Sequence, residues 1–387
     1  MKNIVLPNYE KSILNLINTI LRHYKVETKY KSLPNLEKEL NKNYKNIILI
    51  ILDGMGEHIL NKNLPTGFFR NNEKDIITSV CPSTTTAAMT TYYSGKPPIE
   101  TGWIAMSQYF KENCRAIEML RKIDSHTGEP LKNQKQDVFD LVKYDRVYDK
   151  IEKAQPDVKA YEINPTYCDA RSKRNINADN MELMCDSIKA ICNNKDRNFI
   201  LAYSDKPDLQ LHKYGTSAPE VKEFLEYAQN NIEKMCEQLK GTNTLVIITA
   251  DHGHKDIKNT YSILDLKEIQ DCIIMPASLE SRAITFWVKP EKKQQFENYF
   301  KENLKQDYIL YSKKEFLDSN LLGYGEKHPK IDDFIGDYIA IAIGDSIIKL
   351  ETNISKEKKD KKATHCGFTP EEMEVPLILV NLGPGPT

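Results

Sequence analysis

The chain of 387 residues is longer than one ordinary domain, and its formal net charge is only −1. This balance removes any general electrostatic reason to bind nucleic acid or an anionic membrane, so a charged substrate must be recognised locally. Hydrophobic residues make up 40% of the chain and charged residues 28%, which is typical of a globular protein. We therefore expect a large core that carries an insertion, and no stable complex with nucleic acid.

The cysteines and the N-terminal segment bear on the cellular environment. The eight cysteines are scattered and form no C-x-x-C pair, so neither a zinc ribbon nor a disulfide scaffold is indicated. Reduced thiols in a cytoplasmic protein are the simplest interpretation. The N-terminus lacks the apolar region of a signal peptide, and no stretch reaches the ~18 apolar residues of a membrane span. Apolar residues between Ile13 and Leu21 follow helical spacing, which predicts an amphipathic helix on the core, with a membrane-surface helix as the alternative.

Short apolar runs predict the strands of a central sheet. They are Ile47–Leu52, Phe199–Tyr203, Leu245–Ile248 and Pro376–Val380, and each is rich in Ile, Leu or Val. Such runs are typical of strands buried on both faces of a mostly parallel sheet. Helical patterns at Asp179–Cys192 and Ala218–Leu239 lie between them. This alternation predicts an α/β fold, a three-layer α/β/α sandwich in which ligands bind beyond the carboxyl ends of the strands.

The pattern changes between residues 255 and 335, where we expect a small α+β insertion that is a candidate cap over the site. Its predicted elements are strands at Ala283–Val288 and Tyr308–Tyr311 and a helix at Glu291–Glu302. Tyr338–Ile343 is expected to return the chain to the main sheet, so the core comprises residues 1–254 and 336–387. The charged run at 355–362 is interpreted as a solvated, mobile loop, with a phosphate-attracting rim as the alternative.

Two segments place chemically active side chains after the first strand. Asp53 directly follows Ile47–Leu52 and precedes Gly54 and Gly56, which permit a tight turn. Further on, the threonines at 84–86 precede a helical pattern. A hydroxyl at a helix N-terminus lies where backbone N–H groups favour a phosphate. Taken singly, the aspartate and the threonines are better explained by helix capping.

Three later segments add potential metal ligands. Asp208 and His212 are four residues apart and share a face if helical. Asp251 and His252 are adjacent at a strand end, and both reach one metal only if the chain turns there, as Gly253 permits. His365 precedes the last strand. Each segment is weak evidence alone. Together, three carboxylates, three histidines and a hydroxyl-rich turn at one sheet edge predict a site for two metal ions.

In this order the motifs resemble those of the alkaline phosphatase superfamily, and most closely its nucleotide pyrophosphatase/phosphodiesterase branch. The order is strand-Asp-Gly, Pro-x-x-Thr, Asp-x-x-x-His, Asp-His-Gly and a final histidine turn, and the resemblance extends from about Asn46 to Val380. It implies the three-layer fold, with Asp208, His212 and His365 as ligands of one metal. The other metal would be held by Asp53, Asp251, His252 and Thr85.

The resemblance also implies the chemistry. Thr85 lies three positions after Pro82, as does the family's nucleophile, so Thr84 and Thr86 are expected only to start the helix. A threonine hydroxyl bound to a divalent metal can attack phosphorus and form a covalent intermediate. Two metal ions are expected, with zinc favoured by the Asp/His ligands and manganese compatible with them. The expected activity is cleavage of phosphodiester or pyrophosphate bonds in a small phosphorylated substrate, a nucleotide among the candidates.

The sequence departs from the branch near the substrate. Where these enzymes commonly carry an Asn that contacts a phosphate oxygen, this chain has Met106. Trp103, Met106 and His254 are the candidate substrate contacts, and His254 lies outside the ligand pattern. The alternative function is a phosphomonoesterase. A phosphomutase, whose substrate-domain insertion is not evident, and a non-catalytic metal-binding scaffold are less favoured, and the sequence does not determine the oligomeric state.

Overall fold

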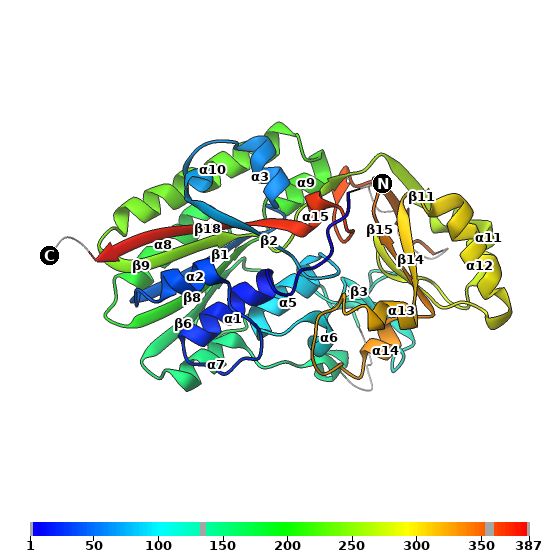
Figure 1. Cartoon of the computed structure of the whole chain (residues 1–387), viewed down its shortest axis with the longest axis horizontal. Helices are drawn as coiled ribbons and strands as arrows, with labels where there is room; N and C mark the ends of the chain where they lie inside the picture. The colour runs from blue at the N-terminus through cyan, green and yellow to red at the C-terminus, as the bar shows by residue number, and fades with distance from the viewer. Residues whose placement is uncertain (1–2, 132–136, 353–359, 385–387) are drawn as a thin grey trace.

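A computed structural model describes residues 3–131, 137–352 and 360–384, which form two sheets with their helices (Figure 1). The main sheet has seven strands in the order β2-β18-β9-β1-β8-β6-β7. Their bounds are β1 (Asn46–Leu52), β2 (Glu73–Thr78), β6 (Val158–Asn164), β7 (Asn175–Asn177), β8 (Arg197–Ser204), β9 (Thr242–Thr249) and β18 (Glu374–Pro384). The strands from β9 to β7 run parallel, and β18 runs antiparallel to both of its neighbours. All four strands expected in the main sheet are therefore confirmed.

Helices cover both faces of the main sheet, as the three-layer prediction requires (Figure 1). One layer contains α1 (Ile13–His23), α2 (Pro34–Leu40), α5 (Thr85–Ser94) and α7 (Val147–Ala154). The other contains α3 (Glu57–Asn63), α4 (Phe68–Asn72), α8 (Met181–Cys192), α9 (Asp208–Tyr214) and α10 (Pro219–Gln238). The apolar face of α1 is fully buried, so the N-terminal helix packs on the core as predicted. Within the described ranges, no helix is both long and apolar enough to cross a membrane.

A second, antiparallel sheet stands beside the carboxyl end of the main sheet (Figure 1). Its order is β14-β15-β13-β12-β3-β4-β5. The strands are β3 (Ser107–Phe110), β4 (Arg115–Glu118), β5 (Ile123–Asp124), β12 (Ser278–Glu280), β13 (Ala283–Phe286), β14 (Tyr308–Ser312) and β15 (Tyr338–Ala342). Helices α11 (Lys267–Cys272), α12 (Lys293–Tyr299), α13 (Lys313–Asp318) and α14 (Ile331–Phe334) accompany it. The expected strands at 283 and 308 and the helix at 291 are all present.

The strand at 338–342 corrects one expectation. Tyr338–Ile343 was predicted to return the chain to the main sheet, but β15 pairs with β13 and β14 in the second sheet. An apolar run of this length fits a buried strand of either sheet, so the sequence pattern could not choose. Hydrogen bonds just before the strand hold it in the second sheet, because the Val288 N–H donates to the Asp337 carboxylate and the Lys313 N–H donates to the Asp337 carbonyl. The second sheet also draws on residues 107–124, well outside the range 255–335.

Shorter elements lead the chain back to the main sheet. They are α6 (Pro98–Thr101), β10 (Lys255–Asp256), β11 (Asn259–Ser262), β16 (Ser346–Lys349), β17 (Ala363–Thr364) and α15 (Pro370–Met373). Strand β10 pairs with β17, and β11 pairs with β16. Most of the charged run predicted as a loop at 355–362 lies outside the described residues.

A buried ion pair joins the two sheets. The guanidinium of Arg282, in the turn between β12 and β13, donates to both carboxylate oxygens of Glu372 in α15, each at 2.7 Å. Both side chains are fully buried. Glu372 also accepts hydrogen bonds from the Gly367 N–H at 2.7 Å and the Thr369 hydroxyl at 2.8 Å. The pair therefore fixes the loop between His365 and α15 against the second sheet.

Removal of this pair should destabilise the fold. Glu372→Ala removes the carboxylate that neutralises the buried Arg282 charge, which should lower the free energy of unfolding by about 3–5 kcal/mol. Urea denaturation followed by circular dichroism measures the change. Glu237→Ala is the control because it breaks a solvent-exposed pair with Lys240, and it should cost less than about 1 kcal/mol. Equal losses in the two variants would contradict the role of the buried pair.

Candidate metal centre

The carboxyl ends of three neighbouring strands lie level at one edge of the main sheet. In the ladder, Leu52 of β1 pairs with Ser204 of β8, and Ile51 pairs with Thr249 of β9. The residues that follow these strands therefore meet. The Asp208 N–H donates to the carbonyl of Asp53 at 2.9 Å, which joins α9 to the end of β1. The backbone therefore brings the polar residues together at this edge, as the sequence predicts.

A sharp turn after β1 makes room for this meeting. Gly54 has φ +77°, a conformation that L residues rarely adopt, and a Cβ there would lie 3.1 Å from the Asp208 Cα and from the His254 ring. The Gly54 N–H also donates to Asp251 Oδ1 at 3.1 Å. The glycine thus permits the close approach of three segments that carry the candidate ligands.

Thr85 is the first residue of α5, and Thr84 is its N-cap. The Thr85 hydroxyl lies 3.3 Å from Asp53 Oδ2 and 3.2 Å from His252 Nε2. The Tyr203 hydroxyl donates to the same Asp53 oxygen at 2.5 Å and holds that carboxylate in place. The threonine oxygen is therefore at a helix N-terminus and in contact with two of its predicted neighbours.

Asp53, Asp251 and His252 form one potential metal-binding cluster, and all three are buried. Asp251 Oδ1 accepts two backbone N–H groups, from Gly54 and His252. The remaining oxygens, Asp53 Oδ1 and Asp251 Oδ2, are buried without a hydrogen-bond partner in the described chain. They lie 3.4 and 3.3 Å from His252 Nε2. Buried polar atoms are rarely left unpaired, so these atoms fit the ligands of a cation.

The electrostatics of this cluster favour a cation. Burial raises the pKa of Asp53 well above its usual value, and the neighbouring Asp251 and Asp208 carboxylates raise it further. A positive charge beside Asp53 would favour the ionised form of its carboxyl group. A divalent metal supplies that charge, and mixed oxygen and imidazole donors suit it. The residues present therefore fit the metal that the donor set implies.

A second cluster surrounds Asp208. One carboxylate oxygen of Asp208 lies 2.7 Å from His254 Nε2, 3.4 Å from His212 Nε2 and 3.8 Å from His365 Nε2. Asp208, His252, His254 and His365 have ligand atoms within 4.8 Å of one another. Burial lowers the pKa of His212, His254 and His365 below the usual value, so these imidazoles are neutral, the form that binds metals.

Hydrogen bonds distinguish the histidines. The Nδ1 atoms of His212, His252 and His365 face backbone carbonyls of Ala363, Gly253 and Ser83 at 2.8, 3.1 and 3.1 Å. A carbonyl only accepts, so each Nδ1 carries the proton and each Nε2 offers its lone pair to the site, as in many metal-binding histidines. His254 lacks such support, because its Nδ1 has no partner in the described chain. The shorter distance to Asp208 favours His254 as the metal ligand. The orientation of the Nε2 lone pair, which the Ala363 carbonyl fixes, favours His212 instead.

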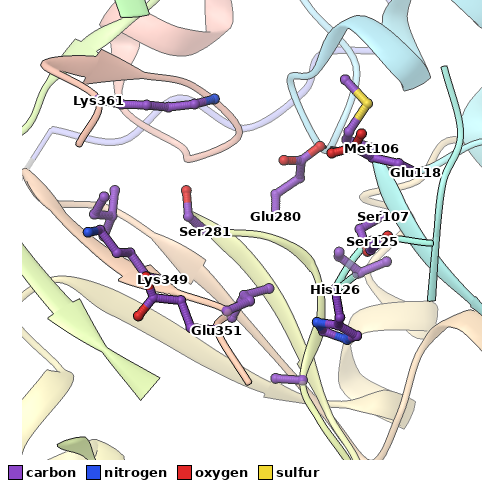
Figure 2. A pocket seen from close by; sticks show the side chains of 14 residues that line it. Met106, Ser107, Glu118, Ser125, His126, Glu280, Ser281, Lys349, Glu351 and Lys361 are labelled. Carbon is purple, nitrogen blue, oxygen red and sulfur yellow. Dashed lines mark hydrogen bonds between the residues drawn. The ribbon is translucent and has the colours of Figure 1, made fainter. Parts of the chain in front are cut away.

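A cavity of about 210 Å³ adjoins this centre (Figure 2). Its wall includes Met106 and Glu280, and Lys361 also lines it. Of the predicted substrate contacts, the structure places Met106 at the cavity and His254 at the metal cluster. Trp103 does not line it. Its indole N–H donates to the Val142 carbonyl at 2.8 Å, and its ring packs near Phe139.

Two residues at the cavity were not named from the sequence as candidate substrate contacts. Glu280 Oε1 accepts hydrogen bonds from the Thr84 hydroxyl at 3.1 Å and the Met106 N–H at 2.7 Å. Lys361 Nζ lies 3.2 Å from His212 Nε2. Lys361 belongs to the charged run at 355–362, for which a phosphate-attracting rim was the alternative interpretation. Glu280 belongs to no motif and lies just before the strand predicted from Ala283, so no sequence signal marked it.

The three-layer fold with this carboxyl-edge site defines a hydrolase of the alkaline phosphatase superfamily. The sequence model for type I phosphodiesterase/nucleotide pyrophosphatase matches residues 47–365, which is most of the chain. The protein therefore belongs to the type I phosphodiesterase/nucleotide pyrophosphatase family, whose members are metal-dependent. The comparison with curated protein sequences gives no significant match.

Solved structures agree on the fold. Murine ectonucleotide pyrophosphatase/phosphodiesterase 5 is 15% identical with a TM-score of 0.62, and the match covers 86% of this chain and 87% of that chain. Phosphonoacetate hydrolase from Sinorhizobium meliloti, in complex with phosphonoformate, is 15% identical with a TM-score of 0.61, covering 86% and 89%. Identity this low shows the fold alone. Both proteins belong to the alkaline phosphatase superfamily, as the motif order predicted.

Metal analysis can distinguish whether His212 or His254 is the metal ligand beside Asp208. His212→Ala should lower the metal content by about one equivalent because it removes an oriented lone pair. The matched variant His254→Ala should retain more metal, since its ring lacks that support. Elemental analysis by mass spectrometry after chelator-free purification measures both. A greater metal loss in His254→Ala would make His254 the ligand.

Proposed function

We propose that the protein cleaves phosphodiester or pyrophosphate bonds of small phosphorylated substrates through a covalent intermediate on Thr85. The position of the Thr85 hydroxyl carries the proposal. It stands at the N-terminus of α5, 3.2 Å from His252 Nε2 and 3.3 Å from Asp53 Oδ2, beside buried oxygens that need a cation. A murine relative has an inactive threonine-to-alanine variant solved in complex with AMP, which supports a nucleophilic threonine and keeps nucleotides among the candidate substrates.

We assign the metal ligands in two sets. One ion would be held by Asp53, Asp251, His252 and the Thr85 oxygen, and the other by Asp208, His212 and His365. Zinc suits these donors, and manganese is the second choice. When bound, the ions lower the pKa of the nucleophile and stabilise the negative charge that develops on the phosphoryl oxygens. Removal of the metal by a chelator should therefore stop turnover.

The protein's own groups perform the remaining steps. In the described chain, the N-terminus of α5 has no side-chain cap, so its first N–H groups can orient a phosphoryl oxygen, and the helix dipole favours the charge of that oxygen. The Thr85 oxygen attacks phosphorus in line as the bond from phosphorus to the leaving oxygen breaks, and the hydroxyl proton passes through solvent to the departing oxygen. Water then attacks the phosphorus of the threonine ester, the bond between phosphorus and the Thr85 oxygen breaks, and a proton from that water restores the hydroxyl. Tyr203 and Gly54 hold the two aspartates that flank the nucleophile throughout the cycle.

A phosphomonoesterase is the second candidate, and Met106 favours it. At the position where the diester-cleaving branch commonly has Asn, Met106 offers only its backbone N–H, and Glu280 accepts it. The thioether adds no donor for a phosphate oxygen. The chain thus lacks the side-chain donor that the diester-cleaving branch commonly has at this position, which weakens the case for a diester without altering the metal ligands.

Loss of the Thr85 hydroxyl should abolish turnover. Thr85→Ala is expected to lower kcat by on the order of 10⁴-fold or more, because the atom that forms the covalent bond is gone. Its secondary structure and thermal melting should match the wild type, since one small side chain in the site is removed. The control is Thr86→Ala, whose hydroxyl has no partner in the described chain, and it should remain active. Full activity of Thr85→Ala would refute the nucleophile.

A pair of chromogenic substrates decides between the two candidate functions. The enzyme should cleave bis-p-nitrophenyl phosphate with a higher kcat/KM than p-nitrophenyl phosphate. The same preparation should contain about two metal equivalents, as a binuclear site requires. Preference for the monoester would replace the leading function with the phosphomonoesterase.

A further inference from the structure

The cavity beside the metal centre brings together charges from separate parts of the chain. Figure 2 shows Glu280 at the end of β12 and Lys361 on the segment before β17, facing the same space. The cavity adjoins the nucleophile, because Glu280 contacts Thr84, the residue before Thr85. It also adjoins the second metal cluster, because Lys361 contacts His212. A group attached to the reacting phosphorus can therefore enter it.

Glu280 is a carboxylate without a cationic partner. The two hydrogen bonds to its side chain, from Thr84 and Met106, both end on Oε1 and come from neutral groups. In the described part of the chain, no lysine, arginine or histidine nitrogen lies within 4.0 Å of either oxygen. Burial raises the pKa of this carboxyl group, and the Met106 hydrogen bond and the Lys361 charge only partly offset that effect. Figure 2 shows its second oxygen turned away from Met106.

Lys361 carries the opposite charge at the same cavity. Its ammonium lies 3.2 Å from His212 Nε2, and within the described ranges it forms no ion pair with a carboxylate. The side chain is exposed, so it can reach a substrate without breaking an ion pair with a described carboxylate. An ammonium beside the metal cluster is placed to contact a phosphoryl oxygen. It offers the donor that Met106 does not.

Two other charges at the cavity have ionic partners: Lys349 pairs with Asp360, and Glu118 lies 3.4 Å from Arg121. Glu351 accepts a hydrogen bond from the neutral Ser262 hydroxyl at 3.0 Å. Glu280 and Lys361 differ from the paired charges because neither forms an ion pair within 4.0 Å with a described residue, and of the carboxylates at the cavity it is Glu280 that contacts Thr84 beside the nucleophile. Two such charges on one small cavity fit a ligand that carries both signs.

We propose that this cavity selects a small zwitterionic substrate, a phosphate or phosphonate ester whose organic group bears a protonated amine. Lys361 contacts the phosphoryl oxygen, and Glu280 receives the amine. The inference rests on the proposed function, because it assigns the substrate class of the same site. The cavity of about 210 Å³ is smaller than the ~300–1,000 Å³ of ordinary ligand pockets, which favours a short amine over a nucleoside.

Matched chromogenic diesters test the substrate class. p-Nitrophenyl 2-aminoethyl phosphate and p-nitrophenyl propyl phosphate have nearly the same shape, and only the first carries an amine. The metal-loaded wild type should favour the amine by about tenfold or more in kcat/KM, mainly through KM, as a charged hydrogen bond allows. Glu280→Gln should lower the amine-to-propyl ratio about tenfold. The control Glu237→Gln, on the surface of α10, should leave that ratio unchanged.

The outcomes separate this inference from the proposed function. Cleavage of both esters with no preference for the amine would overturn the inference and leave the diesterase function standing. Equal losses on both esters in Glu280→Gln would also overturn it, because the residue would then only support Thr84. Preference for p-nitrophenyl 2-carboxyethyl phosphate would assign an anionic substituent instead. If none of the esters is cleaved by metal-loaded enzyme, both proposals fall.

Discussion

The meeting of three carboxylates at one sheet edge is the constraint on which the rest of the site depends. Asp53, Asp208 and Asp251 lie where β1, β8 and β9 end level with one another, and Asp53 and Asp251 are buried there. Burial raises the pKa of Asp53, the other two carboxylates raise it further, and two oxygens of Asp53 and Asp251 have no partner in the described chain. The fold tolerates this arrangement if cations neutralise it, which links the stability of the edge to metal binding.

Residues from both sheets form the site and its cavity. The Arg282–Glu372 pair fixes the chain from His365 to α15 against the turn between β12 and β13. That same turn follows Glu280, so one buried contact governs both a candidate metal ligand and the cavity wall. Most candidate metal ligands therefore follow strands of the main sheet, whereas Glu280 in the cavity wall belongs to the second sheet. This division allows the metal ligands to stay fixed while the second sheet changes the substrate that is accepted.

The structure gives Met106, which stands where the branch commonly has Asn, a different contact. Its side chain gives no donor to a phosphate oxygen, and its backbone N–H instead orients Glu280. A positive charge for the phosphate is available from Lys361, across the cavity. The position that would recognise the phosphoryl group directly has become part of the support for a carboxylate. In the proposed recognition, opposite charges would take the place of an amide, which favours a substrate that differs in charge from those of the branch.

The sequence by itself determined four strands of the main sheet (β1, β8, β9 and β18), the presence of covering helices and the residues that meet at the carboxyl edge. Local patterns suffice for these, because buried parallel strands are continuous apolar runs and the residues after them must converge. Only the tertiary structure decided the place of β15, the approach of His254 to Asp208 and the meeting of Glu280 with Lys361. These depend on which apolar run pairs with which, and on contacts between residues far apart in the chain. Such contacts leave no periodicity or spacing in the sequence to read.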